Sequence, residues 1–230
     1  MNRAVFWDFD GTLARSESLW TGTMHRTLAR FGIDADYETV YAHMHTGFPW
    51  HATEDAWTDA VGYKWWERLF AHFDALYRKL NISADTMEIN RAVREIVLST
   101  DSYIVYDDAA SALQRCAEAG YENYILSNNY PEMEDVIKAL GLHGYFKKFA
   151  VSGQVGYDKP RRELFEYALN LAGNPQTRYM VGDNPVADIR GGKNAGMTTI
   201  LVHNDTPCDA DFVCGSLNEV AEILCGGGEK

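Results

Sequence analysis

The 230-residue chain has few cysteines, an excess of acidic over basic residues, and no apolar run long enough to span a bilayer. The four cysteines show no CxxC spacing, so we expect neither a zinc site nor a disulfide framework. The 21 lysines and arginines are outnumbered by 33 aspartates and glutamates, for a formal net charge of −12. This balance argues against a nucleic-acid partner, because phosphate backbones are held by basic side chains.

The start of the chain does not resemble a signal peptide. It enters an apolar segment at once and becomes acidic by Asp8. We therefore expect a cytoplasmic protein with no membrane partner. The acidic balance is compatible with a small phosphorylated substrate, because a local cation or metal ion can reverse the field inside a site. No pattern indicates a subunit interface, so a monomer and a homodimer both stay open.

Two kinds of hydrophobic pattern divide the chain. Over residues 15–101 the apolar residues recur only at helical spacing, with the strongest stripe running from Trp66 to Leu80. From residue 102 onward, short apolar segments alternate with amphipathic ones, which is typical of βα units. We predict an α/β core of residues 1–14 and 102–230, built on a doubly wound parallel sheet. Residues 15–101 are predicted to form an inserted all-helical cap domain.

The spacing of apolar residues, together with Gly, Pro and capping residues, places the expected elements. Strands are expected at 4–7, 121–126, 148–151, 178–181 and 198–202. In the inserted segment, helices are expected at 20–31, 37–44, 53–60, 66–80 and 89–97. In the core, they are expected at 109–117 and after 216, with two more opened by Pro131 and Pro160.

Two carboxylates end the first predicted strand. Asp8 and Asp10 are separated by one residue and followed by Gly11 and Thr12. In an open parallel sheet, ligands bind beyond the carboxyl ends of the strands. An Asp-Gly pair at a strand end is also a common turn. Two acids with Gly and Thr after a buried strand favour the functional interpretation.

Polar residues also follow later strands. Ser127 and Asn128 come after the strand at 121–126, Asp183 follows the strand at 178–181, and Asp188 lies five residues further on. Lys159 precedes a predicted helix. Taken singly, each residue has an ordinary explanation as a turn or a solvated surface charge. Together they are expected to meet Asp8 and Asp10 at one edge of the sheet.

Four motifs follow one another along the chain: Asp8 to Thr12, Ser127 with Asn128, Lys159, and Asp183 with Asp188. In this order they resemble the motifs of the haloacid dehalogenase-like superfamily, which consists mostly of phosphatases. The resemblance is tight over 3–14 and 120–203, and the helical insert is similar to the C1-type cap of phosphoglycolate phosphatase-like members. It implies a Mg²⁺-dependent phosphatase that hydrolyses a small phosphate monoester through an aspartyl-phosphate intermediate. Magnesium fits the pattern, because it takes oxygen ligands and needs only one or two carboxylates.

The resemblance also implies a role for each matched residue. Asp8 would be the nucleophile and Asp10 the general acid and base, held in position by Thr12. Ser127 and Lys159 would act on the transferring phosphoryl group. Gly11, Thr12 and Asn128 are further candidates for contact with phosphate or substrate. The implied metal ligands are Asp8, the backbone carbonyl of Asp10, and Asp183, with Asp188 acting through a water or behind the direct ligands.

Asp10 also separates branches of the superfamily. Members that cleave carbon–halogen bonds lack an acid at this position, since a halide leaving group needs no proton. The acid present here therefore favours phosphoryl transfer. A sugar phosphomutase keeps the same acid and stays open as an alternative, as does a non-catalytic binding or regulatory protein that retains the fold.

The cap loop at 47–51 is expected to approach the catalytic aspartates. Trp50 and His51 are therefore candidates for substrate contact. Packing within the helical bundle is an equally good explanation of Trp50, and a solvated loop position of His51. No residue pattern identifies a sugar, a nucleotide or glycolate. Arg161 and Arg162 stand where the family often has an acidic or small polar residue; we expect them in solvent, with attraction of an anionic substrate as the alternative.

Overall fold

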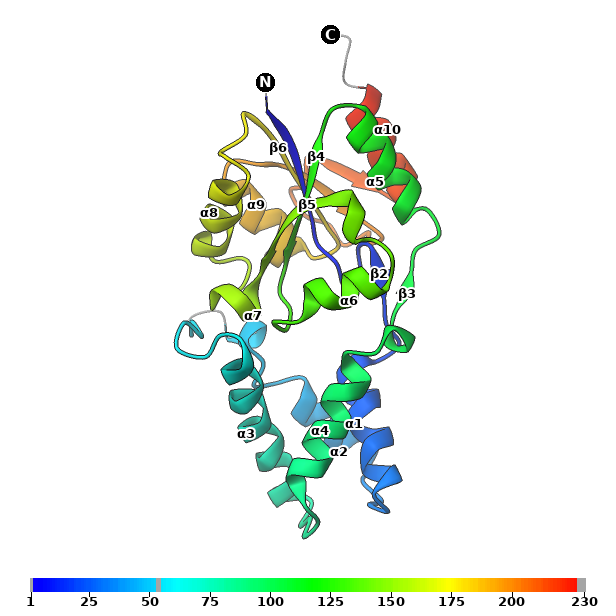
Figure 1. The fold of residues 1–230 in the computed structure, drawn as a ribbon, viewed down its shortest axis with the longest axis vertical. Helices are drawn as coiled ribbons and strands as arrows, with labels where there is room; N and C mark the ends of the chain where they lie inside the picture. Colours follow the sequence, from blue (N-terminus) through cyan, green and yellow to red (C-terminus); the bar gives the residue numbers. More distant parts are fainter. Residues whose placement is uncertain (1, 53–54, 227–230) are drawn as a thin grey trace.

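The computed structural model describes residues 2–52 and 55–226 (Figure 1). Its largest sheet has six parallel strands in the order β5-β4-β1-β6-β7-β8. From the central β1, the chain adds strands first on one side and then on the other. This order confirms the predicted doubly wound parallel sheet. The strands are β1 (Arg3–Trp7), β4 (Glu122–Ser127), β5 (Phe146–Val151), β6 (Thr177–Gly182), β7 (Thr198–Val202) and β8 (Phe212–Cys214).

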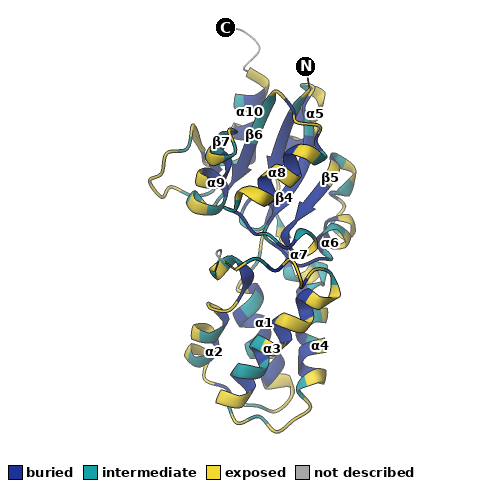
Figure 2. Ribbon diagram, turned by 90° about the vertical axis from the view of Figure 1, so that its left-hand side faces the viewer, coloured by how far each residue is buried: buried dark blue, intermediate teal, exposed yellow. Residues whose placement is uncertain are grey.

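Strand β1 is buried because helices cover both faces of the sheet (Figure 2). Its alternate residues belong to two separate apolar clusters. Val5 and Trp7 pack with α5 (Ala109–Glu118) and α10 (Leu217–Gly226), whereas Ala4 and Phe6 pack with α8 (Arg162–Leu171). The shorter helices of this part are α6 (Met133–Ala139), α7 (Ser152–Val155) and α9 (Gly191–Asn194), with 3₁₀ turns at Thr100–Ser102 and His143–Tyr145 and a π-helical turn at Pro185–Arg190.

Within the described residues of the inserted segment there are four α-helices, and they lie together beyond the carboxyl ends of the strands (Figure 1). We call residues 19–97 the helical part and the remainder the sheet part. Asp36 and Asp85 accept backbone N–H groups at the starts of the second and fourth of these helices. Helix α3 has an apolar stripe that packs against the other helices. The helices are α1 (Leu19–Arg30), α2 (Tyr37–Met44), α3 (Tyr63–Lys79) and α4 (Thr86–Val97), with a 3₁₀ turn at Pro49–His51.

The chain passes between the two parts at a small antiparallel pair of strands. Strand β2 (Ala14–Arg15) pairs with β3 (Ile104–Val105), so the outgoing and returning segments lie side by side. The short strands β2, β3 and β8 were not predicted, because two or three residues carry too little periodicity to be recognised. None of the helices within the described residues combines the length and the apolar character needed to cross a membrane.

The predicted helix at 53–60 is wrong over its described residues, 55–60, which form bends and one turn and no helix. Residues 53 and 54 lie outside the described residues. The backbone N–H of Trp57 donates to the carbonyl oxygen of Gly156 at 2.8 Å, and that of Gly62 donates to Gly153 at 3.0 Å. These bonds attach the segment to the sheet part. The helix predicted to open at Pro160 begins instead at Arg162.

Candidate active site

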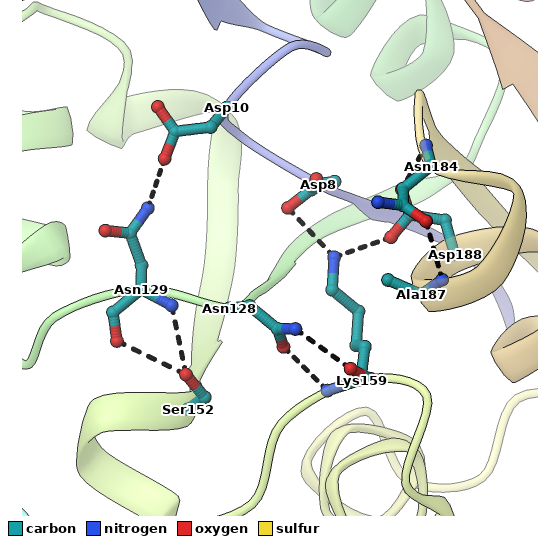
Figure 3. Close-up of polar contacts among 9 residues, drawn as sticks. All are labelled: Asp8, Asp10, Asn128, Asn129, Ser152, Lys159, Asn184, Ala187 and Asp188. Carbon is teal, nitrogen blue, oxygen red and sulfur yellow. Dashed lines mark hydrogen bonds and ion pairs between the residues drawn. The ribbon is translucent and has the colours of Figure 1, made fainter. Parts of the chain in front are cut away.

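Lys159 links two of the predicted carboxylates (Figure 3). Its Nζ lies 2.9 Å from Oδ1 of Asp8 and 2.6 Å from Oδ1 of Asp188. Asp8 follows β1 directly, and its backbone N–H donates to the carbonyl of Val181 in β6 at 2.9 Å. Burial alone would lower the pKa of Lys159. The negative charges of Asp188 and Asp8 raise the pKa by more than burial lowers it, so that it lies above its ordinary value. The lysine is therefore a fixed positive charge between two acids.

Asp10 is held by a residue that sequence reasoning did not select. Nδ2 of Asn129 donates to Oδ2 of Asp10 at 2.6 Å (Figure 3). Burial first, and then the negative charge of Asp8, raise the pKa of Asp10 to about 7. A carboxyl group with this pKa exchanges a proton near neutral pH. The only sequence signal for Asn129 was its place two residues after Ser127 at the same strand end.

Three carboxylates form a site suited to a divalent cation. One oxygen each from Asp8, Asp183 and Asp188 lie within 4.8 Å of one another. Burial, followed by the charges of neighbouring acids, raises the pKa of Asp183 to about 8. Burial also raises the pKa of Asp188 to about 6, against the opposing effect of Lys159. Three neighbouring carboxylates repel one another when all are ionised, and a bound Mg²⁺ ion, which takes oxygen ligands, would offset that repulsion.

Two glycines allow these carboxylates to approach the backbone. A Cβ atom at Gly11 would lie 2.3 Å from Oδ2 of Asp183, and one at Gly182 would lie 2.1 Å from Oδ2 of Asp188. Gly11 also has a φ of 80°, in the left-handed region that favours glycine. Gly11 is therefore placed at the acid cluster, where its missing side chain leaves room for Asp183.

Two predicted hydroxyl groups are buried without a partner. Oγ of Ser127 and Oγ1 of Thr12 have no hydrogen bond to any part of the chain that the structure describes. A buried hydroxyl without a partner is costly, so such groups are available to a ligand that enters the site. The structure gives no hydrogen bond between Thr12 and Asp10; the side chain that contacts the Asp10 carboxylate is Asn129.

Asn128 hydrogen-bonds to both backbone polar groups of Lys159, the N–H and the carbonyl. Its Nδ2 donates to the carbonyl oxygen of Lys159 at 2.9 Å, and its Oδ1 accepts the backbone N–H of Lys159 at 2.6 Å (Figure 3). The amide thus positions the lysine, although Asn128 also lines the cavity described below. On the other side, the backbone N–H of Asn184 donates to Oδ2 of Asp188 at 2.9 Å, which orients that carboxylate toward Lys159.

The site opens into a cavity of about 880 Å³ between the two parts of the molecule. Asp8 and Asp10 share it with Trp50 and His51, so the structure brings both predicted cap residues to the candidate site. Burial lowers the pKa of His51. The sheet part contributes Asp8, Asp10, Ser16, Ser18, Asn128, Asn129, Lys159, Pro160, Asp183, Asn184, Val186 and Ala187; the helical part contributes Leu19, Trp20, Thr21, Tyr41, Met44, His45, Phe48, Trp50 and His51.

The two arginines after the Lys-Pro pair lie elsewhere. Nε of Arg162 is 2.6 Å from Glu166 in an exposed pair, and a guanidinium nitrogen of Arg161 is 3.3 Å from Glu163. Neither arginine is among the described residues that line the cavity. Arg162, whose side chain is 77% exposed, has the expected solvent position, whereas the side chain of Arg161 is only 24% exposed and its guanidinium lies over the ring of Tyr157.

Residues 2–196 match the family model of haloacid dehalogenase-like hydrolases. The chain belongs to this family. Pyrimidine 5′-nucleotidase YjjG of Escherichia coli is 36% identical over 109 residues, which are 44% of this chain and 48% of that protein, so this match spans about half the length of the nucleotidase. Phosphoserine phosphatase of Thermus thermophilus is 26% identical over 249 residues, covering 96% of this chain and all of that protein.

Solved structures show the same fold. The magnesium-bound hydrolase YfnB from Bacillus subtilis has a TM-score of 0.77 at 20% identity, covering 97% of this chain and 99% of that one. A HAD phosphatase from Thermococcus onnurineus has a TM-score of 0.66 at 21% identity and covers 99% of both chains. At these identities the likeness establishes the fold alone. Together with the family match, it makes this chain a hydrolase with a haloacid dehalogenase-like core.

Proposed function

We propose that the protein is a Mg²⁺-dependent phosphatase that hydrolyses a small phosphate monoester through an aspartyl-phosphate on Asp8. The observation that carries the proposal is the pairing of Asp8, fixed by Lys159, with Asp10, whose pKa is raised to about 7. The relatives include proteins named pyrimidine 5′-nucleotidase, phosphoserine phosphatase and glyceraldehyde 3-phosphate phosphatase. Their substrates, as named, differ in the leaving group and share the phosphate.

In the first half-reaction, a carboxylate oxygen of Asp8 attacks phosphorus and the ester P–O bond breaks. Protonated Asp10 gives its proton to the departing alkoxide. In the second, Asp10 takes a proton from a water molecule that attacks phosphorus, and the bond to Asp8 breaks, releasing phosphate. A pKa near the operating pH suits a group that must act in both directions.

The remaining polar groups stabilise the anion as it reacts. Lys159 orients one oxygen of Asp8 and supplies positive charge beside the incoming phosphoryl group. The unpaired hydroxyl of Ser127 is available to donate to a phosphoryl oxygen. Asn128 and Asn129 keep Lys159 and Asp10 in place through the hydrogen bonds described above. All of these groups lie at the carboxyl edge of the sheet, where anion binding is expected.

Mg²⁺ would be held by the carboxylates of Asp8 and Asp183 and by the backbone carbonyl of Asp10. When bound, the ion neutralises charge on the phosphoryl group and on the clustered carboxylates. Asp188 would act behind these ligands, a role supported by its two oxygens, which already accept from Lys159 and from the backbone of Asn184.

We further propose that residues 15–101 are a cap domain on a core of residues 1–14 and 102–230. The antiparallel pairing of β2 with β3, which lie close to the two boundaries between core and cap, supports this division. Such a cap would exclude water and contact the leaving group, with Trp50 and His51 as the residues nearest to that role. The partner implied is a small phosphorylated molecule.

The test is release of inorganic phosphate from a panel of monoesters, with Mg²⁺ and with a chelator, by wild type and Asp8→Asn. We expect metal-dependent release that is abolished in the variant, while its melting temperature stays close to that of wild type. Unchanged turnover by Asp8→Asn would remove Asp8 as the nucleophile. Return of labelled phosphate to a sugar, rather than to water, would instead identify a phosphomutase.

A further inference from the structure

The wall that the helical part contributes to the cavity has no aspartate, glutamate, lysine or arginine among its described residues. Among the residues that the structure describes, the only lysine lining the cavity is Lys159, and it lies on the phosphate side, bound to Asp8 and Asp188. His51 also tends to be neutral, because burial lowers its pKa. The described helical wall of the cavity therefore carries no carboxylate, ammonium or guanidinium group.

This wall disfavours a charged leaving group. A carboxylate or second phosphate on the substrate would lose water on entering, and among the described lining residues it would meet no lysine or arginine other than Lys159, which is already paired. An ammonium group would find no carboxylate on the helical wall; the acids it could reach are those of the catalytic cluster. Phosphorylated amino acids and bisphosphates therefore fit the cavity poorly.

The same wall offers flat aromatic surface. Trp20 and Trp50 both contact Phe48, with ring centroids 4.7 Å and 4.9 Å apart, and Phe48 and Trp50 are stacked at an interplanar angle of 24°. Stacked rings hold each other rigid, so their cavity-facing surfaces are preformed for a planar apolar group. Thr21 of the same wall, with Ser16 and Ser18 of the sheet part, adds uncharged hydroxyl groups to the lining of the cavity.

We propose that the leaving group is an uncharged nucleoside, so that the substrate is a nucleoside monophosphate. A base is planar, aromatic and neutral, and the sugar carries hydroxyls that match the serines and threonine. Hydrolysis breaks the bond between phosphorus and the sugar oxygen, which leaves with a proton as part of the nucleoside, while water supplies the new oxygen of phosphate. This inference rests on the proposed phosphatase function.

The test compares uridine 5′-monophosphate and adenosine 5′-monophosphate with two smaller esters, in the presence of Mg²⁺. Phosphoserine has a charged leaving group, and glycerol 3-phosphate has an uncharged one without a ring. We expect kcat/KM for at least one nucleotide to exceed that for both smaller esters by tenfold or more. A higher kcat/KM for phosphoserine or glycerol 3-phosphate than for both nucleotides would overturn the inference.

A variant of the aromatic wall separates stacking from general damage. Trp50→Ala should raise KM for the preferred nucleotide at least fivefold and leave KM for glycerol 3-phosphate within twofold, and Trp50→Phe should recover most of the loss. Tyr63→Ala serves as the control, because Tyr63 is 60% exposed on α3 and does not line the cavity. Equal effects of Trp50→Ala on both substrates would show that Trp50 does not contact the base.

The outcomes distinguish this inference from the function on which it rests. Release of phosphate at similar kcat/KM from nucleotides and smaller esters would leave the phosphatase proposal standing and remove the nucleoside. Failure to release phosphate from any ester would overturn both. Calorimetric titration of uridine 5′-monophosphate into Asp8→Asn gives a readout independent of turnover, and Trp50→Ala in that background should weaken binding at least fivefold.

Discussion

Replacing Glu132 by alanine should destabilise the contact between the helical and sheet parts. Glu132 directly precedes α6 in the sheet part, and both of its carboxylate oxygens are bound by the helical part. Nε1 of Trp66 in α3 donates to Oε2 at 2.8 Å, and a guanidinium nitrogen of Arg94 in α4 lies 2.5 Å from Oε1. Trp66 is fully buried, whereas the side chains of Glu132 and Arg94 are 25% and 31% exposed.

These exposures set the expected loss of unfolding free energy. Without Glu132, the indole N–H of Trp66 is buried without an acceptor, which costs about 1–3 kcal/mol. The ion pair with Arg94 is partly solvated, so its loss adds at most about 1 kcal/mol. We therefore expect Glu132→Ala to lose about 1–4 kcal/mol in total. Glu132→Gln keeps an acceptor for Trp66 and should lose about 1 kcal/mol or less.

Urea unfolding, followed by tryptophan fluorescence and by circular dichroism, measures both variants. Fluorescence reports mainly on the helical part, because five of the six tryptophans lie there. Glu134→Ala is the control, since the partner of Glu134 is His143 within the sheet part and their side chains are 44% and 41% exposed. Equal losses for Glu132→Ala and Glu132→Gln, or a loss no larger than that of the control, would refute the role assigned to the Trp66 bond.

Three further predictions concern the site and the helical part. Asn129→Ala should raise the pKa of Asp10, because the lost hydrogen bond favours the charged carboxylate, and the pH–rate profile should shift toward higher pH. Lys159→Met, without metal, should lose about 3–5 kcal/mol at pH 8, because two buried carboxylates lose their cation; denaturation at pH 5.5, below the pKa of about 6 of Asp188, should show a smaller loss. His43 and His72 stack with ring centroids 4.1 Å apart, and burial lowers the pKa of both. The unfolded chain therefore binds more protons than the folded chain below about pH 6.5. The free energy of unfolding should fall as the pH drops through that range. His72→Phe should make that fall shallower, and a fall as steep as in wild type would contradict the assignment.

Much of the fold could be predicted from the sequence, because it depends on neighbours along the chain. The alternation in β1 places Val5 and Trp7 on one face of the sheet and Ala4 and Phe6 on the other. The stripe from Trp66 onward predicts α3 by the same local argument. The order of strands and polar residues likewise predicted that Asp8 and Lys159 would meet, because parallel strands bring their carboxyl ends to one edge.

What the sequence did not determine depends on contacts between distant segments. Residues 55–60 have helical spacing, but Trp57 hydrogen-bonds to Gly156, and no local pattern reveals that bond. Asn129 reaches Asp10 across 119 positions of the chain, so its role emerges only when both strand ends share one edge. Periodicity is set by interactions within one or two turns, whereas the partner of a polar side chain is chosen by the packing of the whole fold. The sequence alone thus determined the chemistry of the site, and the tertiary structure decided which residues hold it in place.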